Sequence, residues 1–262
     1  MNSLIVIPAR YNSQRFPGKP LADIVGKTMI QHVYEKAAAS KASRVIVATD
    51  DERIFNTVVK FGGEVIMTSP DHNNGTERCA EVLEHLENKG KGFDILVNLQ
   101  GDEPLINPKE IDKIIDFFKQ NETTEILTLV KEISNLEELE SPNVVKVVST
   151  IFHENTADAL YFSRQVIPYL RNMEKEQWLS NHIFYKHIGI YAFQAEIVPE
   201  LVDVPEAPLE NAESLEQLRW LQDHFVISLL KTQMESNGVD SPEDLERIKQ
   251  LLSNHPQQQK IP

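Results

Sequence analysis

The sequence predicts an α/β fold built on a mostly parallel, open sheet. Short continuous apolar runs, typical of strands buried on both faces, alternate with helix-period patterns through the first 122 residues. The connections are short, as expected where helices join parallel strands. The composition, 41% hydrophobic and 25% charged residues, is that of a globular protein. We expect one domain, 1–252, with a strand–helix half (1–122), a mixed half (123–252) and a frayed tail (253–262).

The first half is expected to contain four strand–helix pairs. The apolar run Leu4–Ile7 is the first strand, and Gly62-Gly63 ends the second helix. Asn107 caps the fourth helix, with Pro108 in its first position. The strands are expected at 4–7, 45–48, 64–68 and 95–99, and the helices at 28–39, 51–61, 76–86 and from 108, where Ile111, Ile114, Ile115 and Phe118 form an apolar stripe.

After about residue 122 the rhythm becomes irregular. The last helix has a clear start, with Ser241 as its cap and Pro242 in its first position. Strands are expected at 126–130, 144–151, 159–162, 188–193 and 226–230, and helices at 136–140, 212–223 and 242–252.

Composition excludes several classes of protein. The net charge of −14 argues against a nonspecific nucleic-acid binder. The only cysteine, Cys79, cannot form an intramolecular disulfide, and its helical context indicates core packing rather than a catalytic thiol. The apolar stretch Leu4–Ala9 is too short for a signal-peptide core. No run approaches the roughly 20 apolar residues of a membrane span.

The loop after the first strand concentrates positive charge. Arg10, Arg15 and Lys19 precede the first acid, Asp23. Ligands of open parallel sheets bind beyond the carboxyl ends of strands, and these side chains suit a polyphosphate. The alternative is a solvated loop whose cations contact neighbouring acids. The loop is neither a Walker motif nor a G-x-G-x-x-G fingerprint.

Two acids are placed to hold a divalent cation. Asp102 follows Gly101 at the end of a buried strand, and Asp240 lies just outside the last helix. One or two carboxylates together with substrate phosphates are the usual setting for Mg²⁺. The alternative in both places is a turn or capping role, although Ser241 and Asp244 already provide the cap of the last helix.

The second half contributes a polar set that suits a hydroxyl-rich anion. Each member alone is more often structural, and Glu213 with Gln217 has the i, i+4 spacing of a solvated helix face. The set comprises Arg164, His187, Tyr191, Glu216 and Gln217.

These motifs resemble those of sugar cytidylyltransferases. The run PARYNSQRFPGKPL, from Pro8 to Leu21, is similar to their amino-terminal signature. Runs further along the chain resemble the branch that acts on 3-deoxy-manno-octulosonate (Kdo). They are VATD, GTER, NLQGDEP, NVVKVV, ALYFSR, HIGIY, LEQLR and VDSPEDL.

The resemblance implies a glycosyltransferase-A-like fold with a smaller dimerisation arm, and a cytoplasmic, homodimeric enzyme of lipopolysaccharide synthesis. The implied reaction is CTP + Kdo giving CMP-Kdo and diphosphate, with Mg²⁺ and without nucleic-acid or membrane partners. The first half would bind the nucleotide and the second half the sugar and the second subunit. The implied nucleotide contacts are Pro8, Ala9, Arg10, Arg15, Lys19, Gly75, Thr76, Arg78 and Gln100. The implied sugar contacts are Gln100, Arg164, His187, Tyr191, Glu216 and Gln217, and the metal and catalytic residues are Asp102 and Asp240, with Lys19 also catalytic.

Three alternatives stay open at this point. One is an NAD-linked oxidoreductase, against which the missing glycine fingerprint argues. Another is a catalytically inactive sugar- or nucleotide-sensing protein, disfavoured by the presence of both Asp102 and Asp240. The third is a cytidylyltransferase for a related acid sugar, such as an amino-substituted Kdo or a sialic acid.

Overall fold

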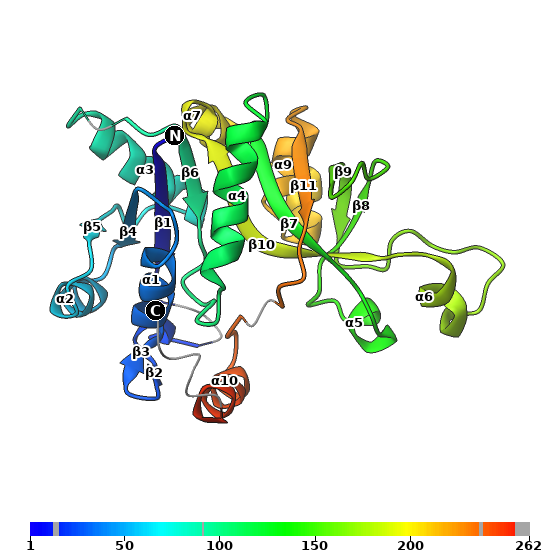
Figure 1. The fold of residues 1–262 in the computed structure, drawn as a ribbon, viewed down its shortest axis with the longest axis horizontal. Coiled ribbons are helices and arrows are strands. Elements are labelled where there is room, and N and C mark those ends of the chain that lie inside the picture. Colours follow the sequence, from blue (N-terminus) through cyan, green and yellow to red (C-terminus); the bar gives the residue numbers. More distant parts are fainter. Residues whose placement is uncertain (13–15, 91, 236–237, 255–262) are drawn as a thin grey trace. The chain divides into compact units, whose positions relative to one another are not determined.

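The structure, a computed structural model, describes residues 1–12, 16–90, 92–235 and 238–254 (Figure 1). The contacts between residues divide the chain into two compact units. Unit 1 comprises residues 1–122 and 236–262, and unit 2 comprises residues 123–235. The division falls where the sequence rhythm changes. The sequence grouped 236–252 with the second half, whereas the structure groups this segment with unit 1. That the units fold as one domain stays a prediction, and the expected frayed tail falls largely outside the described residues.

Unit 1 contains parallel strands in the order β5-β4-β1-β6. The strands are β1 (Ser3–Ala9), β4 (Arg44–Thr49), β5 (Val65–Met67) and β6 (Ile95–Asn98). Leu4 to Ile7 are fully buried, as a strand covered on both faces requires. Because the strands are parallel, their carboxyl ends, and the loops that begin with Arg10, Asp50 and Leu99, meet at one edge of the sheet.

Helices cover both faces of these strands. They are α1 (Met29–Ala38), α2 (Glu52–Lys60), α3 (Gly75–Glu87) and α4 (Pro108–Gln120). A further helix of unit 1, α10 (Pro242–Asn254), packs elsewhere in the unit. In Figure 1, α1 and α4 lie in front of the strands and α3 behind them. The predicted stripe from Ile111 to Phe118 is buried, and so is Cys79 on α3.

A hairpin that the sequence analysis did not predict holds α10 in unit 1. Its strands are β2 (Asp23–Ile24) and β3 (Lys27–Thr28). Ile24 and Met29 join Val239, Leu245, Ile248 and Leu252 in one apolar cluster. The cluster holds the segment that carries Asp240 against the start of the chain.

Unit 2 is built from strands that mostly run antiparallel. They are β7 (Ile126–Glu132), β8 (Lys146–Ser149), β9 (Thr156–Ser163), β10 (Tyr185–Gln194) and β11 (Ile227–Lys231). Among the described strands of unit 2, only β7 and β11 pair in parallel. β8 pairs with β10 as well as with β9, so these strands pair in a closed ring rather than an open sheet.

The helices of unit 2 are short and differ from the prediction in one place. They are α5 (Leu136–Glu140), α6 (Trp178–Asn181), α7 (Val198–Asp203), α8 (Pro208–Glu213) and α9 (Gln217–Gln222). The helix predicted over 212–223 is wrong, because Ser214 adopts a left-handed conformation with φ of 52° that separates α8 from α9. Glu213 and Gln217 therefore do not share a helix face. The strand predicted at 144–151 is shorter, and α6 and α7 were not predicted.

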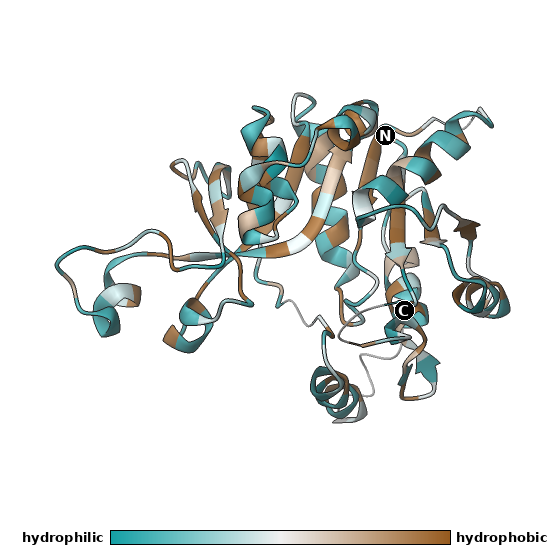
Figure 2. Cartoon of the chain, turned by 180° about the vertical axis from the view of Figure 1, so that it is seen from behind, coloured by the Kyte–Doolittle hydropathy of each residue, from teal (hydrophilic) through white to brown (hydrophobic). Residues whose placement is uncertain are grey.

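The hydropathy of the chain follows this arrangement. In Figure 2 most strands are brown, whereas the helices mix teal with brown. Among the described residues, no helix has the length and apolar character needed to cross a bilayer.

Candidate active site

The edge of unit 1 that follows β1 and β6 contains a hollow of about 290 Å³. Six predicted nucleotide contacts line it together with Asp102, and so do residues that the prediction missed. The predicted residues are Pro8, Ala9, Arg10, Lys19, Gly75, Gln100 and Asp102, and the additional ones are Asn12, Pro20, Asn73, Asn74 and Gly101. Arg15 lies outside the described residues.

Lys19 joins the two predicted metal-binding acids. Its ammonium lies 2.6 Å from Asp102 Oδ2 and 3.4 Å from Asp240 Oδ1. The backbone N–H of Val239 donates to the Asp102 carbonyl at 3.0 Å, which brings these distant parts of the chain together. The alternative interpretation of the loop, cations contacting neighbouring acids, thus holds for Lys19. The acids it contacts are nevertheless the two selected as metal-binding residues.

This donor set suits a hard divalent cation. Two carboxylates converge on one positive group, and their oxygens are the donors that Mg²⁺ prefers. Among the described residues no group of three or more His, Cys, Asp or Glu side chains forms a metal cluster. Substrate phosphates would therefore have to supply the remaining ligands, as is usual for Mg²⁺.

Arg10 is held by the loop that leads into α3. Its guanidinium donates to the carbonyl oxygens of His72, Asn73 and Asn74. Asn74 caps α3, accepting from the N–H of Glu77 at 2.8 Å. The hollow therefore has a helix N-terminus, which favours anions, beside an arginine that can exchange carbonyls for phosphate oxygens.

Close backbone packing explains two glycines of the motifs. A Cβ on Gly101 would lie 3.0 Å from the carbonyl oxygen of Pro8. A Cβ on Gly75 would lie 3.2 Å from Pro8 Cγ and 3.5 Å from Asn98 Nδ2. The first strand and the loops after β6 and before α3 could not approach so closely with larger residues.

Buried polar atoms without partners gather beside these glycines. Thr76 Oγ1, Asn98 Oδ1 and Arg78 Nε are buried and make no hydrogen bond within the described residues. Arg78 is fully buried, with Nη2 3.3 Å from Asp50 Oδ2. Burial lowers the pKa of the Arg78 guanidinium, an effect that Asp50 opposes. Unpaired buried donors and acceptors are costly, so this group suits a polar ligand. Asn98 and Asp50 were not predicted as site residues, although they belong to the NLQGDEP and VATD runs.

In unit 2, a bulge brings His187 and Tyr191 together. The pairing of β10 with β7 shifts between Ile188 and Tyr191. In a regular strand, residues four apart are separated by about 13 Å. The rings of His187 and Tyr191 have centroids only 5.2 Å apart. Gly189, between them, is the sequence signal for such a bulge.

The environment of this pair is buried and mostly uncharged. Burial lowers the pKa of the His187 imidazole to about 4, so the ring is neutral near pH 7. Its Nε2 lies 2.9 Å from the Thr128 hydroxyl. Burial, and secondarily the Glu216 carboxylate, raise the pKa of Tyr191 well above its ordinary value. Glu216 is therefore near the bulge.

Gln217 is buried and incompletely paired. Its side chain is 5% exposed, and Nε2 has no hydrogen-bond partner within the described residues. The Tyr191 hydroxyl is likewise unpaired by ordinary geometry, although Thr128 lies near it. These two groups provide a donor and a donor–acceptor for a hydroxylated ligand.

Arg164 donates hydrogen bonds to backbone carbonyls of three segments of unit 2. Nε, Nη1 and Nη2 each donate to a backbone carbonyl, of Glu213, Pro142 and Ser214 respectively. One N–H on each Nη remains by count. The arginine therefore connects segments of unit 2, whatever it contributes to a ligand.

The family of cytidylyltransferases matches this chain over residues 4–232. Because the match covers most of the chain, the chain belongs to that family. It is 48% identical over 258 residues to the 3-deoxy-manno-octulosonate cytidylyltransferase of Parabacteroides distasonis, covering 97% of this chain and 99% of the relative. The enzyme of the same name from Porphyromonas gingivalis is 48% identical over 247 residues, covering 93% and 94%.

Solved structures agree with this assignment. The chain is similar to a CMP:2-keto-3-deoxy-manno-octonic acid synthetase complexed with CTP, with a TM-score of 0.87, 41% identity, and coverage of 97% of this chain and 100% of the other. An apo UDP-glucose pyrophosphorylase shares the fold alone, with a TM-score of 0.69 and 13% identity over 98% of this chain and 100% of the other. The fold is therefore an α/β nucleotidyltransferase fold.

Proposed function

We propose that the chain transfers CMP from CTP to the anomeric hydroxyl of Kdo, releasing diphosphate. The observation that carries the proposal is the convergence of Lys19, Asp102 and Asp240 beside the 290 Å³ hollow of unit 1. The relatives named above support the choice of CTP and Kdo. A role in lipopolysaccharide synthesis, in the cytoplasm, follows from the same resemblance.

The chemistry needs positioning and charge compensation rather than a protein nucleophile. The anomeric oxygen forms a bond to the α-phosphorus, and the bond from that phosphorus to the bridging oxygen breaks as diphosphate leaves. Arg10 and Lys19 would hold the phosphate oxygens as charge develops on them. Asp102 and Asp240 would hold Mg²⁺, which neutralises phosphate charge and orients the reactants when bound.

Recognition of the sugar is proposed for unit 2. Kdo presents a carboxylate and several hydroxyls, so its site needs a cation and two-way hydrogen bonders. His187, Tyr191, Glu216 and Gln217 supply the hydrogen bonders, and Arg164 supplies the positive charge. Gln100, which the resemblance implies as a further sugar contact, stays a prediction.

A diphosphate-release assay tests the proposal. The purified chain is incubated with each of four nucleoside triphosphates against Kdo, amino-substituted Kdo and sialic acid. We expect diphosphate release to be fastest with the pair CTP and Kdo. No release with any pair would favour a sensing protein, and faster release with another sugar would change the substrate while keeping the reaction class. A melting temperature raised by NAD and not by CTP would favour the oxidoreductase alternative.

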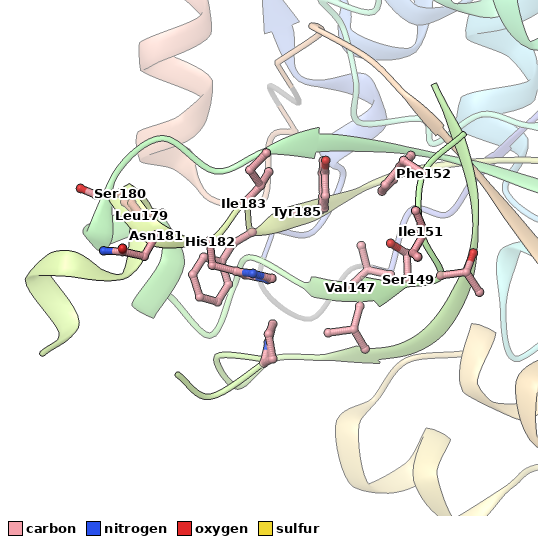
Figure 3. Close-up of a pocket in the computed structure, with 14 residues that line it drawn as sticks. Val147, Ser149, Ile151, Phe152, Leu179, Ser180, Asn181, His182, Ile183 and Tyr185 are labelled. Atoms are coloured by element: carbon pink, nitrogen blue, oxygen red, sulfur yellow. The ribbon is translucent and has the colours of Figure 1, made fainter. Parts of the chain in front are cut away.

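We further propose that the chain forms a homodimer through unit 2. A groove of about 690 Å³ lies there, lined by β8, the β8–β9 loop, the end of α6 and the start of β10 (Figure 3). Ile151 is 82% exposed and Ile183 54% exposed at this groove, which is unusual for large apolar side chains. Light scattering should give twice the chain mass for the wild type and the chain mass for Ile151→Lys. A monomeric wild type would contradict this assembly.

A further inference from the structure

Unit 2 contains a lysine whose side chain has no exposed surface. Lys146 opens β8 and is 0% exposed. Its ammonium donates to the carbonyl oxygens of Ser141, Val144 and Arg164, at 2.8, 2.6 and 2.6 Å. These bonds use all three donors of the ammonium. A buried charge held only by carbonyls is costly, so such an arrangement calls for an explanation beyond packing.

Lys146 donates to the carbonyl of Arg164, and Arg164 in turn donates hydrogen bonds to Glu213. The N–H of Arg164 donates to Glu213 Oε2 at 2.9 Å, and its Nε donates to the Glu213 carbonyl at 2.7 Å. The Ser163 hydroxyl donates to Glu213 Oε1 at 2.6 Å. Both the side chain and the backbone of Glu213 are therefore fixed to the end of β9.

The turn that follows Glu213 is strained. Ser214 has φ of 52° and ψ of 52°, a left-handed conformation that is unfavourable for a residue with a Cβ. Arg164 Nη2 donates to the Ser214 carbonyl at 3.3 Å. This turn redirects the chain from α8 into α9, and Glu216 and Gln217 stand at the start of α9. Their placement depends on how the turn is held.

We infer that Lys146 and Glu213 are positioning residues for sugar recognition. Lys146 fixes Arg164, Arg164 and Ser163 fix Glu213, and Glu213 fixes the turn that presents Glu216 and Gln217. Neither Lys146 nor Glu213 needs to contact the sugar. The inference rests on the proposed sugar site, and it gives Glu213 a role other than that of a solvated helix residue.

Glu213→Gln is the variant that tests the inference. Glutamine keeps the shape but carries no charge and has a single acceptor oxygen, so the charge-assisted bonds donated by the Ser163 hydroxyl and the Arg164 N–H cannot both be kept. At saturating CTP we expect the KM for Kdo to rise at least about fivefold while the KM for CTP stays within twofold. Lys146→Met should act in the same direction, and Glu213→Gln carries the test where Lys146→Met does not fold.

A double-variant cycle separates positioning from general stability. If Glu213 acts through Gln217, Glu213→Gln combined with Gln217→Ala should raise the KM for Kdo no further than Gln217→Ala alone. Glu138→Gln is the matched control, because it removes a carboxylate paired with Lys186 elsewhere in unit 2. We expect it to leave the KM for Kdo unchanged.

The outcomes distinguish the two levels of the proposal. A wild-type KM for Kdo in Glu213→Gln, beside a raised one in Gln217→Ala, overturns the positioning role alone. Effects that multiply in the double variant do the same. A wild-type KM in Gln217→Ala overturns the proposed sugar site and the positioning role with it.

Discussion

The two proposed binding regions differ in the side chains that they offer to a ligand: charged and paired in unit 1, uncharged and incompletely paired in unit 2. In unit 1, Arg10 and Lys19 are charged and already paired, with carbonyls and carboxylates respectively. In unit 2, His187 is neutral, and the Tyr191 hydroxyl and Gln217 Nε2 make no hydrogen bond of ordinary geometry within the part of the chain that the structure describes. A polyanion can be bound by replacing the partners of existing charges, whereas hydroxyls are recognised best by groups that would otherwise stay unpaired. We therefore expect unit 1 to supply binding affinity for the nucleotide phosphates, and unit 2 to supply selectivity for the sugar.

Removing either acid should have the largest effect on turnover. We expect Asp102→Asn and Asp240→Asn each to lower kcat by at least about 100-fold, because each removes a charged metal ligand. The melting temperature should change little, since both side chains lie at an edge. Asp116→Asn is the control, because the Asp116 carboxylate on α4 pairs with Lys41 and Lys119. This variant should keep wild-type kcat. Near-wild-type rates at limiting Mg²⁺ in either test variant would rule out that residue as a ligand.

Removing the cations of unit 1 should come next. Loss of one charged hydrogen bond costs about 1.5–3 kcal/mol, so Arg10→Ala and Lys19→Ala should lose at least about tenfold in kcat/KM for CTP. Steady-state rates and CTP titration by calorimetry measure this. If turnover and CTP affinity both stay unchanged, the loop is only a solvated segment.

Changes in unit 2 should be selective for the sugar. His187→Ala and Gln217→Ala should raise the KM for Kdo about tenfold or more, and much more than the KM for CTP, since each leaves a sugar hydroxyl unpaired. Sugar titration at saturating CTP measures the split, with Gln222→Ala on the same helix as control. Equal competition by sialic acid would remove the selectivity claimed for this region.

The two regions also differ in how closely other atoms approach a backbone glycine. A Cβ on Gly101 would lie 3.0 Å from the Pro8 carbonyl oxygen, whereas one on Gly189 would have no described atom within 4 Å apart from its chain neighbours. Gly101→Ala should therefore lower the free energy of unfolding by about 1–3 kcal/mol and weaken CTP binding. Gly189→Ala should change stability by less than about 0.5 kcal/mol. Denaturant unfolding gives both values, and equal effects would show that the close approach at Gly101 is not needed.

A separate prediction concerns pH. The pKa of His187 is about 4 in the folded chain, below the ordinary value of 6.5. Between these values the unfolded chain binds more protons, so this histidine makes stability fall as pH drops from about 6.5 to 4. The free energy of unfolding of His187→Gln should fall less steeply over that window. Parallel curves for the two proteins would mean that the ring is not buried in its neutral form.

How much the sequence predicts differs between the regions. In unit 1 each motif follows a parallel strand, so strand order alone brings Arg10, Gln100 and Asp102 to one edge. Asp240 joins them through the apolar cluster of α10 and the bond from Val239 to Asp102, which no local pattern reveals. In unit 2 the decisive features are the bulge at Gly189 and the left-handed Ser214. Both are exceptions to a regular period, so periodicity missed them and merged α8 with α9. The sugar contacts came from resemblance, and they remain predictions.

The contact of Lys19 with Asp102 and Asp240 has a consequence for the order in which a substrate and an ion can enter. Without nucleotide, the ammonium is an internal counter-ion that lowers the net negative charge of the acid pair. A divalent ion offered alone must therefore displace a counter-ion that is part of the chain. Phosphate oxygens give Lys19 another anion to contact. The two acids then lose this counter-ion, and the negative charge available to the metal ion increases. Ion exchange of this kind links the two ligands, so Mn²⁺ should bind weakly to the free protein, more tightly with CTP, and more tightly to free Lys19→Met than to free wild type.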